Sequence, residues 1–186
     1  MEQNDQARYE WMALRCQAGE SGALEDLVAV MERPLFYYAA SLLGNPDVAL
    51  DVLQDAWIRI FRGIGKLRDP AALRPWLYSI VHGIAVDHIR KNHSREEAER
   101  LQCEDFNEAE EPSFAEVDAA ALHHALGEIN LKHREVLVLH FLEDLSMAEI
   151  ATVIGCSEGT VKSRLHYAKR QMKQILKGVK HGTAIQ

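Results

Sequence analysis

Apolar residues recur along most of this chain at intervals of three and four, the spacing of α-helices that bury one face. Helices are expected over about 5–17, 20–43, 46–63 and 75–91, and Pro34 is expected to kink or interrupt the second of them. Four shorter helices fit the last third of the chain. No stretch alternates apolar and polar residues with a period of two, and no Asn-Gly or Asp-Gly dipeptide marks a hairpin. The sequence therefore predicts an all-α fold.

The clearest local pattern begins at Ser146. Ser146 and Glu149 have the spacing of a capping box, and Gly155 stands where the helix they start would end. Ser157 can cap a second helix, whose apolar positions recur at spacings of four, three and four. Its apolar stripe is Val161, Leu165, Ala168 and Met172, and its opposite side, flanked by Lys162 and Arg164, carries Gly159, Thr160, Ser163, His166, Tyr167 and Arg170. This pattern favours a DNA-binding helix-turn-helix, although a helical hairpin with a solvated basic face also fits it.

Two helices of the first half carry distinctive outer faces. The 46–63 helix should bury Leu53, Ala56, Trp57, Ile60 and Phe61, and its opposite side carries Asp51, Asp55, Ile58 and Arg62, with Gln54 and Arg59 beside them. An exposed isoleucine among charges indicates a protein-binding surface, or it has no special cause. The 75–91 helix should bury Leu77, Ile80, Val81, Ile84 and His88, and its outer face carries Ser79, His82, Gly83, Val86, Ile89 and Arg90. Gly83 is either a tolerated weak point or a place of close approach by a partner.

The charges of the chain are unevenly distributed. Its net charge of −7 argues, on its face, against nucleic acid. However, the acidic residues are concentrated between Glu96 and Asp118, where only Arg100 opposes them, whereas the ionised residues from Val161 to Lys180 are all basic. The acidic stretch has few large apolar residues and reads as a flexible linker between two helical domains. The basic C-terminal stretch remains compatible with DNA binding.

Composition excludes several other classes. No apolar run approaches the ~20 residues of a membrane span, and the N-terminus lacks a basic, apolar export signal. Cys16, Cys103 and Cys156 are far apart, and no H-E-x-x-H motif occurs, so neither a disulfide framework nor a metal site is expected. We expect a cytoplasmic protein without cofactor or metal, without membrane insertion and without a small-molecule substrate.

Three motifs resemble one family. They are Asp51-Val-Leu-Gln-Asp-Ala-Trp-Ile-Arg, then Pro75-Trp-Leu-Tyr-Ser-Ile-Val-His-Gly-Ile-Ala-Val-Asp-His-Ile-Arg-Lys, and finally Glu149-Ile-Ala with Gly159-Thr-Val-Lys-Ser-Arg-Leu. In this order and spacing they resemble the extracytoplasmic-function (ECF, group 4) sigma factors of bacterial RNA polymerase over nearly the whole chain. The resemblance implies a region 2-like domain at 1–93, an acidic linker at 94–115, a region 4-like helix-turn-helix domain at 116–178 and a tail at 179–186.

The resemblance also implies partners and sites. The chain would bind core RNA polymerase and promoter DNA, and a cognate anti-sigma factor would inhibit it. The polymerase clamp would contact Asp51, Gln54, Asp55, Ile58 and Arg59. The minus-ten element, with a base flipped from the stack, would contact Lys66, Leu67, Arg68, His82, Gly83, His88, Arg90 and Lys91. The minus-thirty-five element would contact Thr160, Lys162, Ser163, Arg164, Tyr167 and Arg170.

The chain departs from the family pattern at two positions, and two other classes compete with it. Gly83 stands where the family usually has asparagine, and Tyr167 stands where arginine is frequent. One rival is a regulator that binds promoter DNA on its own, using the first half for effector binding or dimerisation. The other is an enzyme with His82, Asp87 and His88 as a catalytic cluster. Because positions 82 and 88 lie about 120° apart around a helix, the two histidines do not share a face well.

Overall fold

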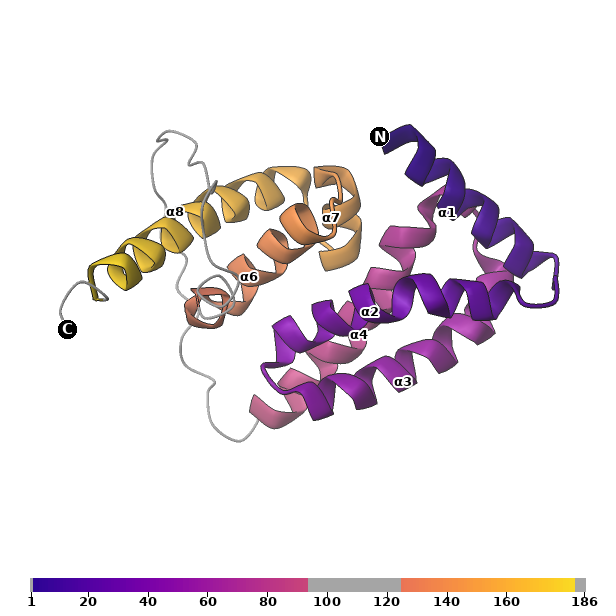
Figure 1. The fold of residues 1–186 in the computed structure, drawn as a ribbon, viewed down its shortest axis with the longest axis horizontal. Helices are drawn as coiled ribbons and strands as arrows, with labels where there is room; N and C mark the ends of the chain where they lie inside the picture. The colour runs from indigo at the N-terminus through magenta and orange to yellow at the C-terminus, as the bar shows by residue number, and fades with distance from the viewer. Residues whose placement is uncertain (1, 94–124, 183–186) are drawn as a thin grey trace.

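The computed structural model describes residues 2–93 and 125–182, and all regular structure within those ranges is helical. The predicted acidic linker lies outside the described residues. In the first half the elements are α1 (Glu2–Gln17), α2 (Ala23–Leu43), α3 (Pro46–Gly63), the short 3-10 turns η1 (Ile64–Lys66) and η2 (Pro70–Ala72), and α4 (Leu73–His93). In the second half they are α6 (Leu131–Leu137), the π-helical turn η3 (Val138–Leu142), α7 (Met147–Ile154) and α8 (Glu158–Gly182) (Figure 1). The all-α prediction is confirmed for this part of the chain.

Local chemistry explains where the first-half helices begin and end. Asn45 caps α3 by accepting hydrogen bonds from the backbone N–H groups of Asp47 and Val48, and Pro46 occupies the first helical position. The predicted interruption at Pro34 does not occur, because α2 is continuous through it. Fully buried residues on both sides of the proline, Met31 and Leu35, hold the helix together by tertiary packing. α4 begins at Leu73 rather than at Pro75, since a proline is tolerated in the first turn.

The core of the first half is centred on α2, whose buried residues pack against α3 and α4. Two predicted apolar core positions differ in the structure: Phe61 is 44% exposed, and Ile80 of α4 is half-buried. Ile60 is buried as predicted, and Ile64 is buried as well. Phe61 is left at the edge of the apolar stripe, where its ring stacks on Trp57 with centroids 5.6 Å apart. In α4, Tyr78 is fully buried, whereas His88 is only half-buried.

The second half contains the predicted helix-turn-helix. Ser146 and Glu149 form the capping box, with the Ser146 N–H donating to the Glu149 carboxylate at 2.9 Å. Gly155 ends α7 in the left-handed conformation at φ 66°, and Ser157 Oγ accepts from the N–H of Thr160 at 3.1 Å to cap α8. The stripe Val161, Leu165, Ala168 and Met172 is buried as predicted. In α7, Val153 takes a buried position and Ile154 is half-buried.

The two halves pack against each other. α4 contacts α7, and α2 contacts α6 and η3, so the second half leans on the α2–α4 side of the first (Figure 1). α8 lies on the far side of α6 from α2 in the same view, in contact with α6 and α7. Within the described residues, the helices are all too short or too polar to cross a membrane.

Candidate functional site

The outer face of α3 is an exposed strip of mixed character. The side chains of Asp51, Gln54, Asp55, Ile58 and Arg59 are all exposed, as predicted for a contact surface. Two large apolar side chains that the sequence analysis did not place there, Leu50 and Phe61, are 48% and 44% exposed. Leu50, Gln54, Ile58 and Phe61 follow one another at spacings of four, four and three, so their sequence positions already put them on one side of the helix. We use the term α3 strip for seven residues: Leu50, Asp51, Gln54, Asp55, Ile58, Arg59 and Phe61.

A loop with two cations follows α3. Lys66 and Arg68 are exposed, and Leu67 between them is half-buried. The side-chain amide of Gln17, at the end of α1, donates to the carbonyl oxygens of Ile64 at 3.2 Å and Leu67 at 2.7 Å. Gln17 was not recognised from the sequence, because its partners lie about fifty positions away. These two bonds fix the backbone from which Lys66 and Arg68 project.

The α4 residues that the sequence predicts to contact DNA are only partly exposed. Arg90 and Lys91 are exposed, and Arg90 lies 3.8 Å from Asp87, a surface ion pair that contributes little to stability. His82, by contrast, has a side chain only 16% exposed, and its Nε2 lies 3.2 Å from the carboxylate of Glu135 in the second half. The structure therefore does not present all the predicted minus-ten residues as one surface.

Gly83 has open space around it. A Cβ added at this position would meet no atom within 4 Å, so that the described structure provides no close neighbour that requires glycine. Replacing Gly83 with alanine should therefore stabilise the chain by ~1 kcal/mol, the usual gain in a helix interior. This corresponds to about 2–4 °C in melting temperature for a chain of this size. Scanning calorimetry measures it. Gly155→Ala, at φ 66°, is the control and should lower the melting temperature; a fall for Gly83→Ala would contradict the prediction.

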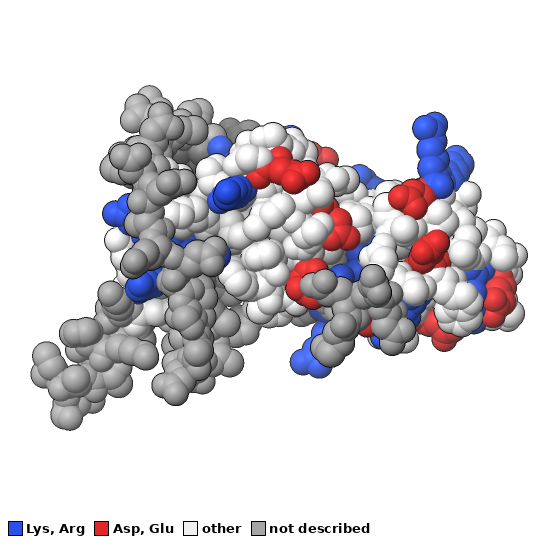
Figure 2. All heavy atoms as spheres, turned by 90° about the horizontal axis from the view of Figure 1, so that it is seen from above, with Lys and Arg blue, Asp and Glu red and all other residues white. Residues whose placement is uncertain are grey.

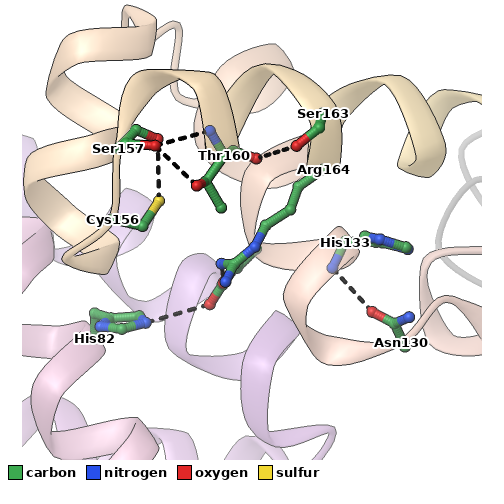
Figure 3. Close-up of polar contacts among 9 residues, drawn as sticks. His82, Asn130, His133, Cys156, Ser157, Thr160, Ser163 and Arg164 are labelled. Atoms are coloured by element: carbon green, nitrogen blue, oxygen red, sulfur yellow. Dashed lines mark hydrogen bonds and ion pairs between the residues drawn. The ribbon is translucent and has the colours of Figure 1, made fainter. Parts of the chain in front are cut away.

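The front of α8 presents small polar side chains near its N-terminus. The hydroxyls of Ser157 and Thr160 lie 2.9 Å apart, and Ser163 Oγ donates to the carbonyl of Thr160 at 3.0 Å (Figure 3). The ring of Tyr167 stacks near His133, with centroids 6.2 Å apart. Exposed positions on this side of the helix include Lys162, Ser163 and Arg170. On the face shown in Figure 2, Lys and Arg side chains are interspersed with Asp and Glu over the described residues.

Arg164 is the exception among the predicted α8 contacts. Its side chain, 24% exposed, extends away from the front and donates to a carboxylate oxygen of Glu135 at 2.9 Å. Glu135 is 95% buried, since its relative exposure is 5%. Figure 3 shows Arg164 and His82 pointing toward one another from α8 and α4, and both contact this one carboxylate. Glu135 directly follows Lys132-His133-Arg134 in the sequence, so no local signal marked it as buried, although a buried glutamate is usually paired.

Taken together, these elements define a class of protein. A capped α7, a glycine turn and an α8 with a polar and basic front form a helix-turn-helix DNA-binding unit, and the first half adds a second exposed surface in the α3 strip. The sequence family described as Sigma-70 region 2 matches residues 18–95, and the one described as Sigma-70 region 4 matches residues 119–172.

Individual relatives agree with these matches. The chain is 29% identical to the RNA polymerase sigma factor SigV of Bacillus subtilis over 76% of this chain and 84% of that protein. It is 31% identical to the ECF RNA polymerase sigma factor SigL of Mycobacterium tuberculosis over 86% of this chain and 92% of that protein. The fold resembles the sigma factor RpoE in its complex with the anti-sigma factor NepR from Bartonella quintana, with a TM-score of 0.68, 21% identity, and coverage of 84% of this chain and 98% of that one.

The chain belongs to the ECF RNA polymerase sigma factors. It directs transcription initiation, and it is an initiation factor rather than an enzyme. The resemblance noted in the sequence is confirmed, and the two rival classes fall away.

Proposed function

We propose that this sigma factor binds core RNA polymerase through the α3 strip, reads and melts the minus-ten element with the 66–68 loop and α4, and reads the minus-thirty-five element with the front of α8. The observation that carries the proposal is the α3 strip itself. All five residues assigned to polymerase binding are exposed on one helix, beside two exposed large apolar side chains. A DNA-binding regulator that acts alone has no need of such a strip, whereas a protein that docks on polymerase does.

The minus-ten assignment rests on Lys66, Leu67, Arg68, His82, Gly83, His88, Arg90 and Lys91, which belong to the loop after α3 and to α4. A loop whose backbone is already fixed by Gln17 suits the capture of a flipped base. Unstacking a base costs a few kcal/mol, and an ordered pocket can offset that cost. Exposed Lys66, Arg68, Arg90 and Lys91 supply charge for the phosphates.

Substitution of Gln17 tests the ordering of this loop. Gln17→Ala removes both donors to the loop carbonyls, so the rate of promoter opening should fall roughly fivefold or more, given about 1 kcal/mol for each hydrogen bond. Gln17→Glu keeps the size but also loses the donors, and it should be at least as impaired. Permanganate reactivity of unpaired thymines measures opening, with exposed Gln174→Ala on α8 as the control. Normal opening in both Gln17 variants would contradict the role of the loop.

The minus-thirty-five assignment rests on Thr160, Lys162, Ser163, Arg164, Tyr167 and Arg170 on α8. Small hydroxyl side chains near the helix N-terminus allow close approach to base edges, and the cations reach phosphates on either side. Tyr167 offers a ring and a hydroxyl where relatives often have arginine, so its contact with DNA differs in chemistry.

We further propose inhibition by a dedicated anti-sigma protein and a cytoplasmic location. The support is the family itself and the RpoE structure, which was determined with its anti-sigma factor. Such a partner would mask the α3 strip, whose exposed Leu50, Ile58 and Phe61 would otherwise remain in contact with water.

Multi-round transcription tests the proposed function directly. Purified core RNA polymerase would receive this protein and a library of randomised promoters, and the transcripts would be sequenced. Discrete transcripts that depend on the protein, with shared motifs near minus ten and minus thirty-five, are expected. If no transcript appears while the protein alone shifts specific duplex DNA, the protein does not act through the polymerase as proposed.

A further inference from the structure

The aromatic ring of Tyr167 is held in place in the middle of the α8 front. Tyr167 lies one helical turn after Ser163 and one turn before Arg170, and both of those side chains are exposed. Tyr167 itself is half-buried. The ring of His133 on α6 stacks on it with centroids 6.2 Å apart, and the ring of His166 meets it edge-on with centroids 5.6 Å apart. Contacts on two sides restrict the ring to one orientation.

The orientation of His133 is fixed in turn by two hydrogen bonds. Its backbone N–H donates to the side-chain oxygen of Asn130, the cap of α6, at 3.0 Å (Figure 3). Its ring Nδ1 lies 2.8 Å from the side-chain oxygen of Gln171 on α8. Because an amide oxygen only accepts, Nδ1 carries the hydrogen of this bond. Gln171 follows Tyr167 by four positions, so that α8 itself fixes the imidazole that stacks on the Tyr167 ring.

We propose that Tyr167 is a specificity-determining residue that reads the C5-methyl group of a thymine in the minus-thirty-five element, and that His133 and Gln171 are positioning residues that hold its ring for this contact. The inference rests on the proposed function, because it takes the front of α8 to lie in the major groove at that element. It adds a base preference and a supporting contact from α6 to the residues proposed above.

A fixed aromatic ring favours one feature of the major groove. Base edges there present hydrogen-bond donors and acceptors, and the C5-methyl of thymine is the apolar group among them, with which apolar and aromatic side chains pair. An amino or carbonyl group placed against ring carbons would lose its water without gaining a partner. A methyl group in the same place gains from burial. Because the Tyr167 ring is already held, this contact also avoids the cost of ordering a flexible side chain.

The nearest long cation does not compete for the same base. Arg164 precedes Tyr167 by three positions, and its guanidinium is turned away from the front to the Glu135 carboxylate at 2.9 Å. A guanidinium beside the ring would instead favour guanine, whose O6 and N7 it bonds. Ser163, on the other side, is short, and its hydroxyl donates to the carbonyl of Thr160. The ring is therefore the large group that this part of the front presents.

Removal of one methyl group from the promoter tests the contact. The holoenzyme would be offered two promoter fragments that carry the minus-thirty-five motif selected in the transcription library and differ only in one thymine, replaced in the second fragment by deoxyuridine. Competition between the fragments gives the ratio of their affinities, and each thymine of the element is replaced in turn on either strand. One replacement should weaken binding about fourfold, which corresponds to the burial of one methyl group.

Variants of Tyr167 assign this effect to its ring. Tyr167→Ala should abolish the preference for thymine over uracil at that position. Tyr167→Phe keeps the ring and loses the hydroxyl, so it should retain the preference. Tyr167→Arg, selected again on the promoter library, should replace this thymine by guanine, roughly tenfold preferred, because a guanidinium forms two hydrogen bonds with that base.

Variants at the supporting positions test how the ring is held. His133→Ala and Gln171→Ala should reduce the preference for thymine over uracil to less than about twofold, because part of the methyl contact is lost when the ring moves. His133→Phe can still stack on Tyr167 and should restore most of the preference. Lys132→Ala, at the exposed neighbouring position of α6, is the control. Loss of its charge acts on both fragments alike, so the ratio should not change, and a general loosening of α8 would likewise leave it unchanged.

Two results would overturn the inference: a selected element in which no thymine methyl affects binding, or a methyl effect that persists in Tyr167→Ala. A methyl effect of wild-type size in His133→Ala, or one that His133→Phe fails to restore, would overturn the positioning role of His133. In each of these cases, protein-dependent transcripts from the library would leave the proposed function intact. The absence of such transcripts would instead reject the proposed function, and the thymine contact with it.

Discussion

Asp55→Arg should reduce promoter-specific transcription roughly 100-fold or more. Asp55 is exposed near the middle of the α3 strip. In the proposed complex, reversing its charge would place a cation against a polymerase surface that accepts a carboxylate. A like-charge contact within an interface costs several kcal/mol, and each 1.4 kcal/mol is a factor of ten in affinity. Because the side chain is exposed, the fold should be unaffected. Capture of the protein on immobilised core polymerase should fall in parallel with transcription, which would locate the defect at binding.

Glu32→Arg provides a matched control for this variant. Glu32 is also an exposed acid on a first-half helix, α2, but it lies outside the α3 strip. The same charge reversal should leave polymerase capture and transcription within twofold of wild type. Equal losses in the two variants would indicate a general effect of net charge. Full activity of Asp55→Arg would remove α3 from the proposed interface.

Leu165→Ala should unfold or severely loosen the helix-turn-helix. Leu165 is 3% exposed in the buried stripe of α8, and truncation of such a leucine costs about 2–5 kcal/mol through lost burial and a residual cavity. A small helical domain has little stability beyond this amount. The α8 amides should lose protection from hydrogen exchange, and transcription that depends on the minus-thirty-five element should be largely lost. Polymerase capture through α3 should persist.

Gln174→Ala is the control for Leu165→Ala, because it truncates a side chain of the same helix without affecting the core. Gln174 lies on the same helix, and its side chain is exposed, so its truncation should change stability by less than ~0.5 kcal/mol. Retained exchange protection of α8 in Leu165→Ala would show that the stripe does not hold the helix as the structure indicates.

Core packing and polar pairing involve neighbouring positions of the same helix. The buried stripe of α8 is apolar and keeps the helix in place, whereas Arg164, one residue before Leu165, reaches the Glu135 carboxylate.

The sequence alone determined the local elements. The cap of α3 at Asn45, the capping box of Ser146 and Glu149, the left-handed Gly155 and the stripe of α8 all involve residues within a few positions of one another. Such contacts obey fixed spacings, so the pattern predicts them directly. The three motifs also indicated the family, which the comparisons confirmed. The assignments of individual contact residues to polymerase and DNA remain predictions.

Only the tertiary structure decided which of these side chains are free. Gln17 holds a loop 47 and 50 positions away, Glu135 lies 53 positions from His82 and 29 from Arg164, and Phe61 leaves the core because Ile60 and Ile64 fill it. Partners so far apart obey no spacing rule, since their contact depends on how whole helices are docked. The same sequence pattern that marks Arg164 and His82 as DNA contacts therefore could not reveal that one buried carboxylate binds both.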